Sequence, residues 1–343
     1  MYKLAEKNVL VTGGAGFIGS HIVDKLLERD NMVIAYDNLS SGYESFIAHN
    51  FNNSSFTFIK KDLADFNTLN KVMKDIDFVF HLAANPDIRY GVQHTDWDLK
   101  QNTLTTYNVL EAMRINGKRR IAFASTSACF GSAENIPTPE NYGIAKPESL
   151  YGASKLAGEG LISAFVHTFG FQTWIYRFSN IIGDRGVTHM VLVDFIRKLT
   201  NNPKELEILG NGKQSKPLLL VQDCVDAMLF IVENSMEKLN IYNIAPEDRI
   251  SSITKIAEVI IEEMELKNAT ITYTGGEKGW PGDVPVYQLS NKKLKSLGWE
   301  AKYTSEEALR IAVKILVSNT ENQYGISFYA EPGKYLLSQS KKK

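Results

Sequence analysis

The sequence predicts an α/β fold: a doubly wound parallel sheet with helices on both faces, followed by a smaller C-terminal α/β domain. Three observations lead to this prediction. Short apolar segments alternate with helical segments through the first half of the chain, a glycine-rich turn joins the first strand to the first helix, and the strict alternation ends near residue 178. Strands that are buried on both faces read as continuous apolar runs, and parallel neighbours need long crossovers, which are usually helical.

The elements of the first half follow from apolar spacing. The expected strands are apolar runs of five or six residues, at 8–12, 32–36, 56–60, 78–83, 120–124 and 172–177. Apolar residues three or four positions apart predict the helices between them, at 17–29, 66–74, 95–116 and 151–169. The crossovers should be right-handed.

The second half of the chain has a looser pattern. We expect helices at 191–199, 221–232, 252–264 and 305–317, and strands at 206–209 and 239–244. Thr304 and Glu307 have the spacing of a capping box before the last helix. The expected division is a first domain at residues 1–178, a second domain mainly at 179–318 with some segments returning to the first, and a polar tail at 319–343.

The composition excludes several classes of protein. Lys and Arg number 38 and Asp and Glu number 39, so the net charge of −1 creates no overall field for nucleic acid or an anionic membrane. No apolar run approaches the length that spans a bilayer. The two cysteines cannot form a disulfide framework, and no signal-peptide pattern is present. We expect a soluble cytoplasmic protein without nucleic-acid or membrane partners.

The first motif is the glycine-rich turn after the first strand. Gly13 permits the tight turn, Gly16 lets the backbone approach a pyrophosphate, and Gly19 lets the helix lie close to the sheet. The helix N-terminus offers free N–H groups to phosphates. Asp37, at the end of the second strand, is placed to accept hydrogen bonds from the ribose hydroxyls of adenosine. Because no Lys or Arg follows in residues 38–42, the motif predicts a Rossmann-type domain that binds NAD rather than NADP.

Two other interpretations of this turn are considered. Gly14 and Gly19 have the spacing of a P-loop, but Ser20 and His21 stand where that motif requires Lys followed by Ser or Thr. The second interpretation is a glycine turn that has a purely structural role and binds no cofactor. The strand before the turn, the helix after it and the acid at Asp37 favour dinucleotide binding over both.

The second motif is Tyr151 with Lys155 at the start of an expected helix. Residues four apart share a helix face, so both side chains point the same way. A neighbouring ammonium and a positively charged nicotinamide lower the pKa of a tyrosine from its usual value of about 10, and the phenolate then acts as a base.

The third motif is Ser-Thr-Ser-Ala at residues 125–128, where the fifth strand ends. The carboxyl ends of parallel strands are where ligands bind in such sheets, so a hydroxyl of this motif is expected beside Tyr151. Ordinary capping and turn chemistry by Ser and Thr is the alternative interpretation.

Together these motifs resemble the extended short-chain dehydrogenase/reductase family, in its NAD-dependent epimerase/dehydratase branch. The likeness is greatest to nucleotide-sugar epimerases of the UDP-glucose 4-epimerase type, particularly the archaeal-type members, and it extends over residues 7–317. The further motifs that carry it are Asp62-Leu63, His81-Leu82-Ala83-Ala84, Asn102, Arg177-Phe178-Ser179-Asn180, residues 210–214, residues 279–284 and Leu297-Gly298-Trp299.

The resemblance implies a set of site residues. Tyr151 is the catalytic base, Lys155 lowers its pKa and binds the nicotinamide ribose, and Thr126 occupies the catalytic Ser/Thr position. Besides Tyr151 and Lys155, the residues implied to hold NAD are Gly13, Gly16, Phe17, Ile18, Asp37, Asn38, Asp62, Leu63, Ala83, Ala84 and Asn102. The residues implied to contact the nucleotide sugar are Thr126, Ser127, Asn180, Lys216 and Asp283. A homodimer through helices 95–116 and 151–169 is also implied.

The residues after Thr126 favour one reaction of this family. Its 4,6-dehydratases have Asp-Glu there, and its sugar-acid decarboxylases have Glu at the second position, whereas this chain has Ser127 and Ala128. Elimination of water needs a proton donor and a proton acceptor, which these two residues do not supply. We therefore expect a 4-epimerase that oxidises C4, turns the keto sugar and reduces it again. The alternatives are a nucleotide-sugar dehydratase or 4-dehydrogenase/reductase, a dehydrogenase of small alcohols, and a non-catalytic NAD-sensing protein.

Several positions depart from the family pattern. Lys216 stands where a phosphate-binding Arg is common, and Trp280 stands where many 4-epimerases have a second one. Arg89 or Arg185 is our candidate for the missing charge. The substrate side of the site is therefore the part that the resemblance defines least.

Three further sequence features bear on the chemistry. His189 precedes an expected helix and is interpreted either as an acid or as a plain loop residue. Cys129 lies one position beyond the place where related epimerase-reductases carry a catalytic cysteine, so we expect it to be buried and structural. The six histidines show no metal-ligand spacing with acids or cysteines, and no metal is expected.

Overall fold

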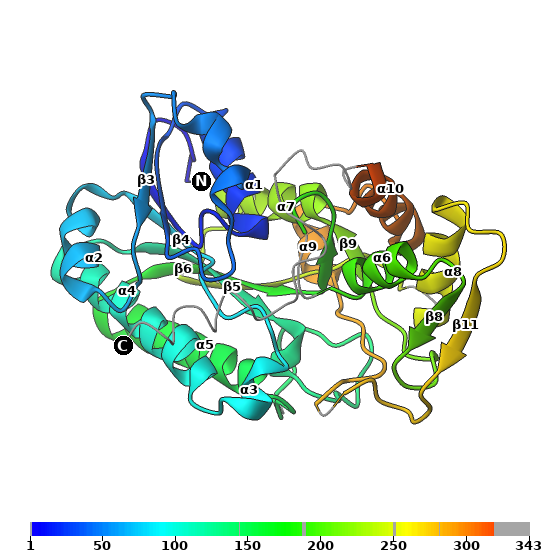
Figure 1. Ribbon diagram of the computed structural model, residues 1–343. Coiled ribbons are helices and arrows are strands. Elements are labelled where there is room, and N and C mark those ends of the chain that lie inside the picture. Colours follow the sequence, from blue (N-terminus) through cyan, green and yellow to red (C-terminus); the bar gives the residue numbers. More distant parts are fainter. Residues whose placement is uncertain (1, 144, 187–189, 250–251, 281, 319–343) are drawn as a thin grey trace.

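The computed structural model describes residues 2–143, 145–186, 190–249, 252–280 and 282–318. Across these residues the central feature is a seven-stranded sheet in the order β10-β6-β5-β4-β1-β2-β3, and every neighbouring pair is parallel (Figure 1). Its strands are β1 (Asn8–Thr12), β2 (Met32–Asp37), β3 (Phe56–Lys60), β4 (Phe78–His81), β5 (Arg120–Thr126), β6 (Gln172–Phe178) and β10 (Leu239–Ile244). The predicted doubly wound, Rossmann-type sheet is confirmed.

The strand order reverses next to β1. The chain runs outward from β1 through β2 to β3, then crosses back to β4 on the other side of β1 and continues to β5 and β6. In an open parallel sheet, such a reversal leaves a crevice at the carboxyl ends of the two strands that flank it. The crevice here lies at the ends of β1 and β4, beside Thr12 and His81.

Two layers of helices cover the sheet. On one face lie α2 (Phe66–Val72), α4 (Thr105–Ile115) and α5 (Leu150–Phe169), and on the other lie α1 (Phe17–Leu27) and α7 (Val221–Asn234) (Figure 1). The alternation along β1 decides which side chain meets which layer, since Val9 and Val11 join the core with α1 and α7 while Leu10 joins the core with α4 and α5. All three side chains are fully buried.

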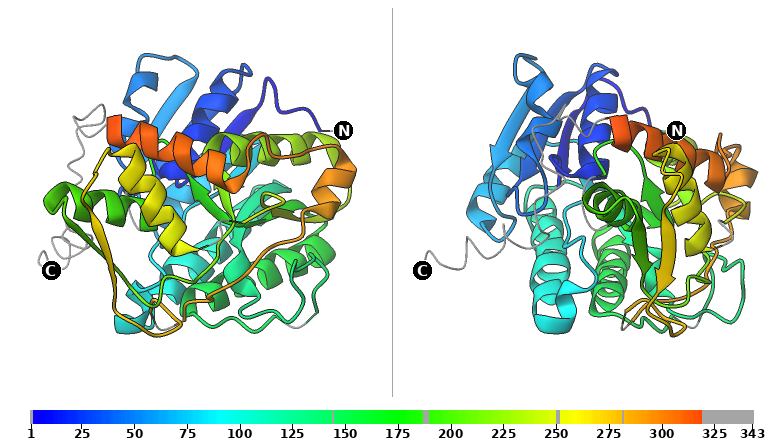
Figure 2. Two further views of the ribbon diagram at one scale, coloured as in Figure 1. Left: turned by 90° about the vertical axis from the view of Figure 1, so that its right-hand side faces the viewer. Right: turned by 45° about the vertical axis from the view of Figure 1, so that its right-hand side comes forward.

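A smaller α/β unit stands beyond the carboxyl edge of the sheet. Its strands form two parallel pairs, β7 (Asn180–Ile182) with β9 (Leu218–Leu220) and β8 (Glu205–Ile208) with β11 (Thr270–Tyr273). Its helices α6 (Val191–Asn201), α8 (Ile253–Glu263) and α10 (Ser305–Ser318) pack around a second apolar core (Figure 2). The separate cores agree with a sheet domain and a smaller C-terminal unit, although the residue boundaries that we expect for the two domains remain a prediction.

Most of the expected elements are present, and the misses have physical causes. The short elements β7, β9, β11, α3 (Tyr90–Gln93) and α9 (Lys292–Leu297) were not expected, because three to six residues are too few to show a periodicity. The helix expected at 95–116 contains a π-helical stretch at Leu99–Leu104 before α4, where apolar spacing gives no warning. Of the segments after residue 178, the strand at residues 239–244 joins the main sheet and α7 covers one of its faces.

The capping box before the last helix is present. The Thr304 N–H donates to a Glu307 carboxylate oxygen at 2.9 Å, and the Glu307 N–H donates to the Thr304 hydroxyl at 3.3 Å. The expected tail at 319–343 lies outside the described residues.

Candidate active site

One large cavity follows the carboxyl edge of the sheet and continues into the smaller unit. Its volume is about 1210 Å³. Its walls come from the glycine turn, the ends of β2, β4, β5 and β6, the start of α5, helix α6 and the segment around residues 279–287. Pockets for a single small ligand usually measure about 300–1,000 Å³, so this cavity has room for a dinucleotide and a second ligand.

The glycine turn forms one end of the cavity. Gly13 has a φ of +70°, and a Cβ there would lie 2.7 Å from the Ala83 nitrogen. A Cβ at Gly19 would lie 1.9 Å from the Gly13 carbonyl oxygen, so α1 approaches the turn as closely as the sequence predicts. No side chain caps the N-terminus of α1, which begins after Gly16. Its first N–H groups and the positive end of its dipole are therefore available to a pyrophosphate.

Asp37 lies where an adenosine ribose would sit. Its carboxylate lines the cavity, is 8% exposed, and accepts hydrogen bonds from the Ala15 N–H at 3.0 Å and the Leu39 N–H at 2.8 Å. Burial raises the pKa of Asp37, and these two hydrogen bonds lower it. Each carboxylate oxygen still has acceptor capacity for a hydroxyl. Next to it, the Asn38 amide donates to Asp62 at 2.7 Å and joins the second and third strand ends.

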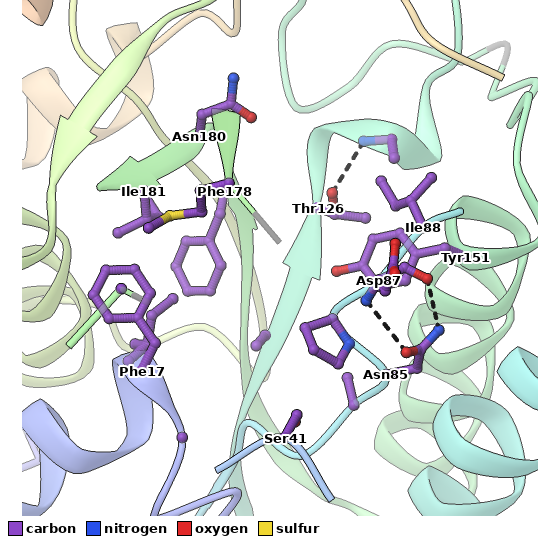
Figure 3. Close-up of a pocket in the computed structure, with 18 of the residues that line it drawn as sticks. Phe17, Ser41, Asn85, Asp87, Ile88, Thr126, Tyr151, Phe178, Asn180 and Ile181 are labelled. Atoms are coloured by element: carbon purple, nitrogen blue, oxygen red, sulfur yellow. Dashed lines mark hydrogen bonds between the residues drawn. The ribbon is translucent and has the colours of Figure 1, made fainter. Parts of the chain in front are cut away.

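The expected catalytic side chains meet in the middle of the cavity. Tyr151 and Lys155 come from the first turns of α5, which Ser149 caps by accepting from the Gly152 N–H at 3.0 Å. The Tyr151 hydroxyl is hydrogen-bonded to Thr126, which ends β5, and the two side chains face each other (Figure 3). Lys155 is buried behind them, and its Nζ donates to the Ala124 carbonyl at 2.8 Å.

The electrostatics of this group differ from the sequence expectation in one respect. Burial is the largest effect on Tyr151 and raises its pKa, the Cys129 thiol and the Asp98 carboxyl raise it further, and the hydrogen bond with Thr126 lowers it. Burial lowers the pKa of Lys155 to about 8. The ammonium is not among the main influences on the tyrosine in the protein alone, so the positively charged nicotinamide is left as the group that would favour the phenolate.

The cavity brings together nearly all of the residues that the resemblance implies. Those that line it are Gly13, Gly16, Phe17, Ile18, Asp37, Asn38, Asp62, Leu63, Ala83, Ala84, Thr126, Ser127, Tyr151, Lys155, Asn180, Lys216 and Asp283. Asn102 is the exception, because it is buried behind the wall. Its side-chain oxygen accepts from the Asn85 N–H at 2.8 Å, and its amide donates to the Ser154 hydroxyl at 2.8 Å. Asn102 thus holds the 85–89 loop against α5, and Asp87 and Ile88 of this loop line the cavity.

Of the cationic side chains expected to bind a phosphate, Lys216 and Arg185 are instead paired with carboxylates of the chain. The Lys216 ammonium lies 2.9 Å from an Asp283 oxygen and also donates to the Val284 carbonyl. Burial lowers the pKa of Lys216, and Asp283 raises it. Arg185 does not line the cavity, and its guanidinium pairs with Asp24 of α1 at 2.8 Å. Arg89 does line it.

Two groups at the site were missed by sequence reasoning. Tyr287 lines the cavity, and its hydroxyl is hydrogen-bonded to the Ser127 side chain and the Asn180 N–H. It therefore contacts two residues that were expected to bind the sugar. No local pattern identifies it, because Ser127 lies 160 positions earlier in the chain. Glu159 is four residues beyond Lys155 on the buried face of α5, so its helical spacing was a readable signal.

Glu159 anchors a buried polar cluster beneath the catalytic residues. Arg177 forms a bidentate pair with it at 2.9 and 2.7 Å, and the Ser125 hydroxyl donates to it at 2.5 Å. The cluster ties α5 to the ends of β5 and β6. Cys129 is fully buried beside it, as expected, and burial raises the pKa of its thiol to about 12. His189 lies outside the described residues.

The sequence and the fold are both similar to those of known proteins. Residues 9–245 match the sequence profile of the NAD dependent epimerase/dehydratase family. The chain belongs to this family. A solved UDP-galactose 4-epimerase is 36% identical, with a TM-score of 0.81, and the match covers 91% of this chain and 99% of the other.

Other members of the epimerase/dehydratase family are similarly close. A UDP-N-acetylglucosamine 4-epimerase from Methanobrevibacter ruminantium is 30% identical, with a TM-score of 0.81 over 92% of this chain and 99% of its own. A UDP-glucose 4-epimerase from Thermotoga maritima, solved with UDP-glucose, is 29% identical, with a TM-score of 0.82 over 91% and 99%. The expectation of a family enzyme that uses NAD is confirmed.

The residues of this family member fit NAD. The uncapped start of α1 suits the pyrophosphate, and the Asp37 carboxylate suits the adenosine ribose. In the part of the chain that the structure describes, no group of three His, Cys, Asp or Glu side chains is arranged to hold a metal ion. Within the same residues, no helix combines the length and apolar character that crossing a membrane requires.

Proposed function

We propose that this family member is a nucleotide-sugar 4-epimerase that inverts the C4 hydroxyl of a UDP-hexose-like substrate. The observation that carries the proposal is the group of Thr126, Tyr151 and Lys155 at the NAD crevice, with Ser127 and Ala128 in place of an acid–base pair. The similar solved structures named UDP-sugar 4-epimerases support the same reaction. A dehydratase needs an acid and a base at C5 and C6, which residues 127 and 128 do not supply.

The mechanism starts from the tyrosine. Tyr151 takes the proton of the C4 hydroxyl, and Thr126 holds the same oxygen through a hydrogen bond. Lys155 lies behind both and would contact the nicotinamide ribose of bound NAD. When bound, NAD supplies the chemistry of C4 oxidation and reduction by accepting a hydride and returning it. Tyr151 then gives the proton back to the C4 oxygen, which restores the hydroxyl.

Inversion requires that the keto sugar present its other face before reduction. The wall around the expected sugar position combines Ser127, Asn180 and Tyr287, whose hydroxyl and amide groups offer exchangeable hydrogen bonds rather than a rigid charged clamp. Such a wall holds the sugar weakly enough to turn. The nucleotide, held farther out between α6 and the 279–284 segment, keeps the substrate from leaving during the turn.

The remaining assignments belong to the same proposal. The lining residues of the glycine turn, Asp37, Asn38, Asp62, Leu63, Ala83 and Ala84 hold NAD, while Asn102 supports the site from behind. We also place the enzyme in the cytoplasm and propose the two-domain division at residue 178. A homodimer through α4, the π-helical stretch that precedes it and α5 fits the exposed apolar side chains of these elements, which include Leu104 (49% exposed), Tyr107 (44%) and Leu150 (43%). A shift from dimer to monomer in Leu104→Glu, measured by analytical ultracentrifugation, tests this interface.

The test of the function is a substrate panel. Purified protein is incubated with NAD and UDP-, GDP-, CDP- and dTDP-hexoses, and products are read by NMR while absorbance reports NADH. The proposal predicts a 4-epimer without net NADH. Loss of water from the sugar would assign a dehydratase, and stoichiometric NADH would assign a dehydrogenase. NAD binding without any product from the panel would favour the non-catalytic alternative.

A further inference from the structure

Two charged side chains lie buried beneath the catalytic residues and take no part in the proposed transfers of proton and hydride. Glu159, on α5, is 6% exposed, and Arg177, on β6, is 8% exposed. They form a bidentate ion pair with N···O distances of 2.9 and 2.7 Å. Taking two charges out of water costs free energy, and well-packed apolar residues of similar volume often stabilise a core equally well or better. Stability alone therefore does not explain why this pair is buried here.

Consecutive residues of β5 contact successive turns of α5. The Ser125 hydroxyl donates to the Glu159 carboxylate at 2.5 Å, and the Ala124 carbonyl accepts from the Lys155 ammonium at 2.8 Å. Lys155 and Glu159 are four residues apart, so they share the face of α5 that meets the strand. The next residue of the strand is Thr126, at its carboxyl end. The helix and the strand are thus joined by two polar contacts immediately before the catalytic threonine.

The helix also lies close to the strand at this point. A Cβ on Gly158 would lie 2.9 Å from the Phe123 ring, so a side chain there would collide with the ring. The same ring lies 4.9 Å from the Lys155 ammonium. A helix advances about 1.5 Å per residue, so a slip of α5 by one residue would move Tyr151 by about that distance relative to Thr126. A misplacement of about 1 Å between reacting groups costs a large factor in rate.

Arg177 holds Glu159 from the neighbouring strand. It is the register partner of Ser125 in the β5–β6 pair, and its third guanidinium nitrogen donates to the Glu140 carbonyl at 2.9 Å. The guanidinium also lies over the Phe130 ring, 4.7 Å from the ring centre. The carboxylate oxygen that accepts from Ser125 is the one that accepts from the Arg177 Nε. Because the guanidinium is itself fixed, Glu159 is held at the place where it binds Ser125.

We propose that Glu159 is a positioning residue of the epimerase reaction. Acting through Ser125, it sets the place at which Tyr151 meets Thr126. The inference rests on the proposed function, because the reaction that it serves is the one proposed there. Glu159 keeps α5 in register with β5 while the proton passes between Tyr151 and the C4 oxygen. Loss of this link should therefore slow the reaction and leave ligand binding largely unchanged.

The first variant cuts the link and spares the ion pair. Ser125→Ala removes the hydroxyl and leaves Glu159 paired with Arg177, so no buried charge loses its partner. With the substrate that reacts in the panel, kcat should fall about 10- to 100-fold, while KM and bound NAD stay within about twofold of the wild type. Ser235→Ala is the matched control, because that hydroxyl is also buried and accepts from the Trp174 Nε1 at 2.9 Å near the start of β6. It should keep the wild-type kcat.

A double variant tests whether the ion pair only stabilises the fold. Glu159→Leu/Arg177→Met removes both charges together, so the free energy of unfolding in urea should stay near the wild-type value or exceed it. The inference predicts that kcat nevertheless falls as in Ser125→Ala, because the Ser125 hydroxyl then has no carboxylate to bind. Bound NAD and unfolding in urea are measured on the same preparations, so that a loss of kcat is read only from folded, NAD-loaded protein.

The outcomes separate this inference from the function on which it rests. If the wild type forms the 4-epimer and Ser125→Ala does so at the same rate, the inference is wrong. Wild-type turnover in the stable double variant would show that the pair is only a structural element. A rise in KM or a loss of NAD as large as the fall in kcat would assign Ser125 to ligand binding instead. A wild type that retains NAD and forms no 4-epimer contradicts the proposed function itself, and the positioning role falls with it.

Discussion

The two halves of the cavity offer their proposed ligands different kinds of binding group. At the cofactor end, the groups that we propose for NAD are backbone N–H groups at the start of α1 and one carboxylate, Asp37, and they come from β1, α1 and β2 in direct succession. At the substrate end, the groups are side chains from α6, the 214–216 segment and the 279–287 segment, and the charges there are mostly paired inside the chain, as in Lys216 with Asp283.

This difference shows what local sequence encodes. A site made of backbone is fixed by glycines at set spacings, because only glycine permits the φ of Gly13 and the contact at Gly19. A site made of side chains from distant segments depends on packing, and its charges are set by whichever carboxylates fold beside them. Substitutions in either half of the cavity can test this contrast.

The largest effect, on turnover, is expected for Tyr151, which lies where the two halves of the cavity meet. Tyr151→Phe removes the base and keeps the ring, so turnover should fall about 10²- to 10⁴-fold while bound NAD stays at the wild-type level. Turnover and NAD content are measured on the same preparation. Tyr303→Phe, exposed just before α10, is the control and should keep both. A Tyr151→Phe enzyme with near-normal turnover would remove the tyrosine from the mechanism.

Breaking the ion pair of the substrate half comes next. Lys216→Met leaves Asp283 buried without its cation, and the free energy of unfolding should fall by about 3–5 kcal/mol. The double variant Lys216→Met/Asp283→Leu should recover most of this loss, because it removes both charges. Urea unfolding measures the free energy of unfolding of both variants. Equal stability of Lys216→Met and the wild type would show that the pair is not a structural element of this half.

A smaller loss of stability is expected when a methyl group is added to the glycine turn of the cofactor half. Gly19→Ala places a methyl group against the Gly13 carbonyl, which should cost about 1–3 kcal/mol of stability and reduce NAD retention. Gly160→Ala, a helical position on α5 with open space around it, should instead stabilise the protein by about 0.5–1 kcal/mol. Thermal unfolding with and without added NAD distinguishes them. Normal NAD retention in Gly19→Ala would contradict the close approach of α1 to the turn.

The smallest effect is the loss of folding stability at low pH that the buried His81 should cause. His81 is fully buried between the Thr12 and Thr106 hydroxyls, and burial lowers its pKa to about 3. The unfolded chain binds this proton near pH 6.5 and the folded chain does not, so stability should fall as the pH drops from about 6.5 toward 3, by about 1.4 kcal/mol per pH unit.

The pH effect is checked by urea unfolding at pH 7 and pH 5. His81 should account for about 2 kcal/mol of the difference, and His81→Gln should lose that part of the pH dependence. His167→Gln, on the exposed end of α5, is the matched control and should keep it. The same pH dependence in His81→Gln as in the wild type would mean that His81 is not the titrating group.

The sequence predicted the parts of the molecule that depend on local patterns. Alternating strands and helices, the turn at Gly13 and the pairing of Tyr151 with Lys155 on one helix face all rest on residues within a few positions of each other. The structure differs where contacts join distant segments. Lys216 meets Asp283 across 67 positions, and Arg185 pairs with Asp24 across the domain boundary that we expect.

In the protein alone, the electrostatics of the Tyr151–Lys155 pair differ from the expectation for a related reason. The spacing of Tyr151 and Lys155 implies that the ammonium lowers the tyrosine pKa, but spacing carries no information about burial. Burial dominates both groups, and the Lys155 ammonium is directed to the Ala124 carbonyl. Tyr287 was missed because nothing near it in the sequence resembles Ser127 or Asn180, which it contacts.

The measurement that tests the central claim most directly follows the hydrogen at C4. The nucleotide hexose that reacts in the panel is prepared with deuterium at C4 and incubated with the NAD-loaded enzyme in ordinary water. An epimerase that removes and returns this hydride predicts a 4-epimer that keeps the deuterium at C4, with no net NADH. Deuterium lost to water, or found at another carbon of a dehydrated sugar, would contradict the proposal that oxidation and reduction at C4 are the whole reaction.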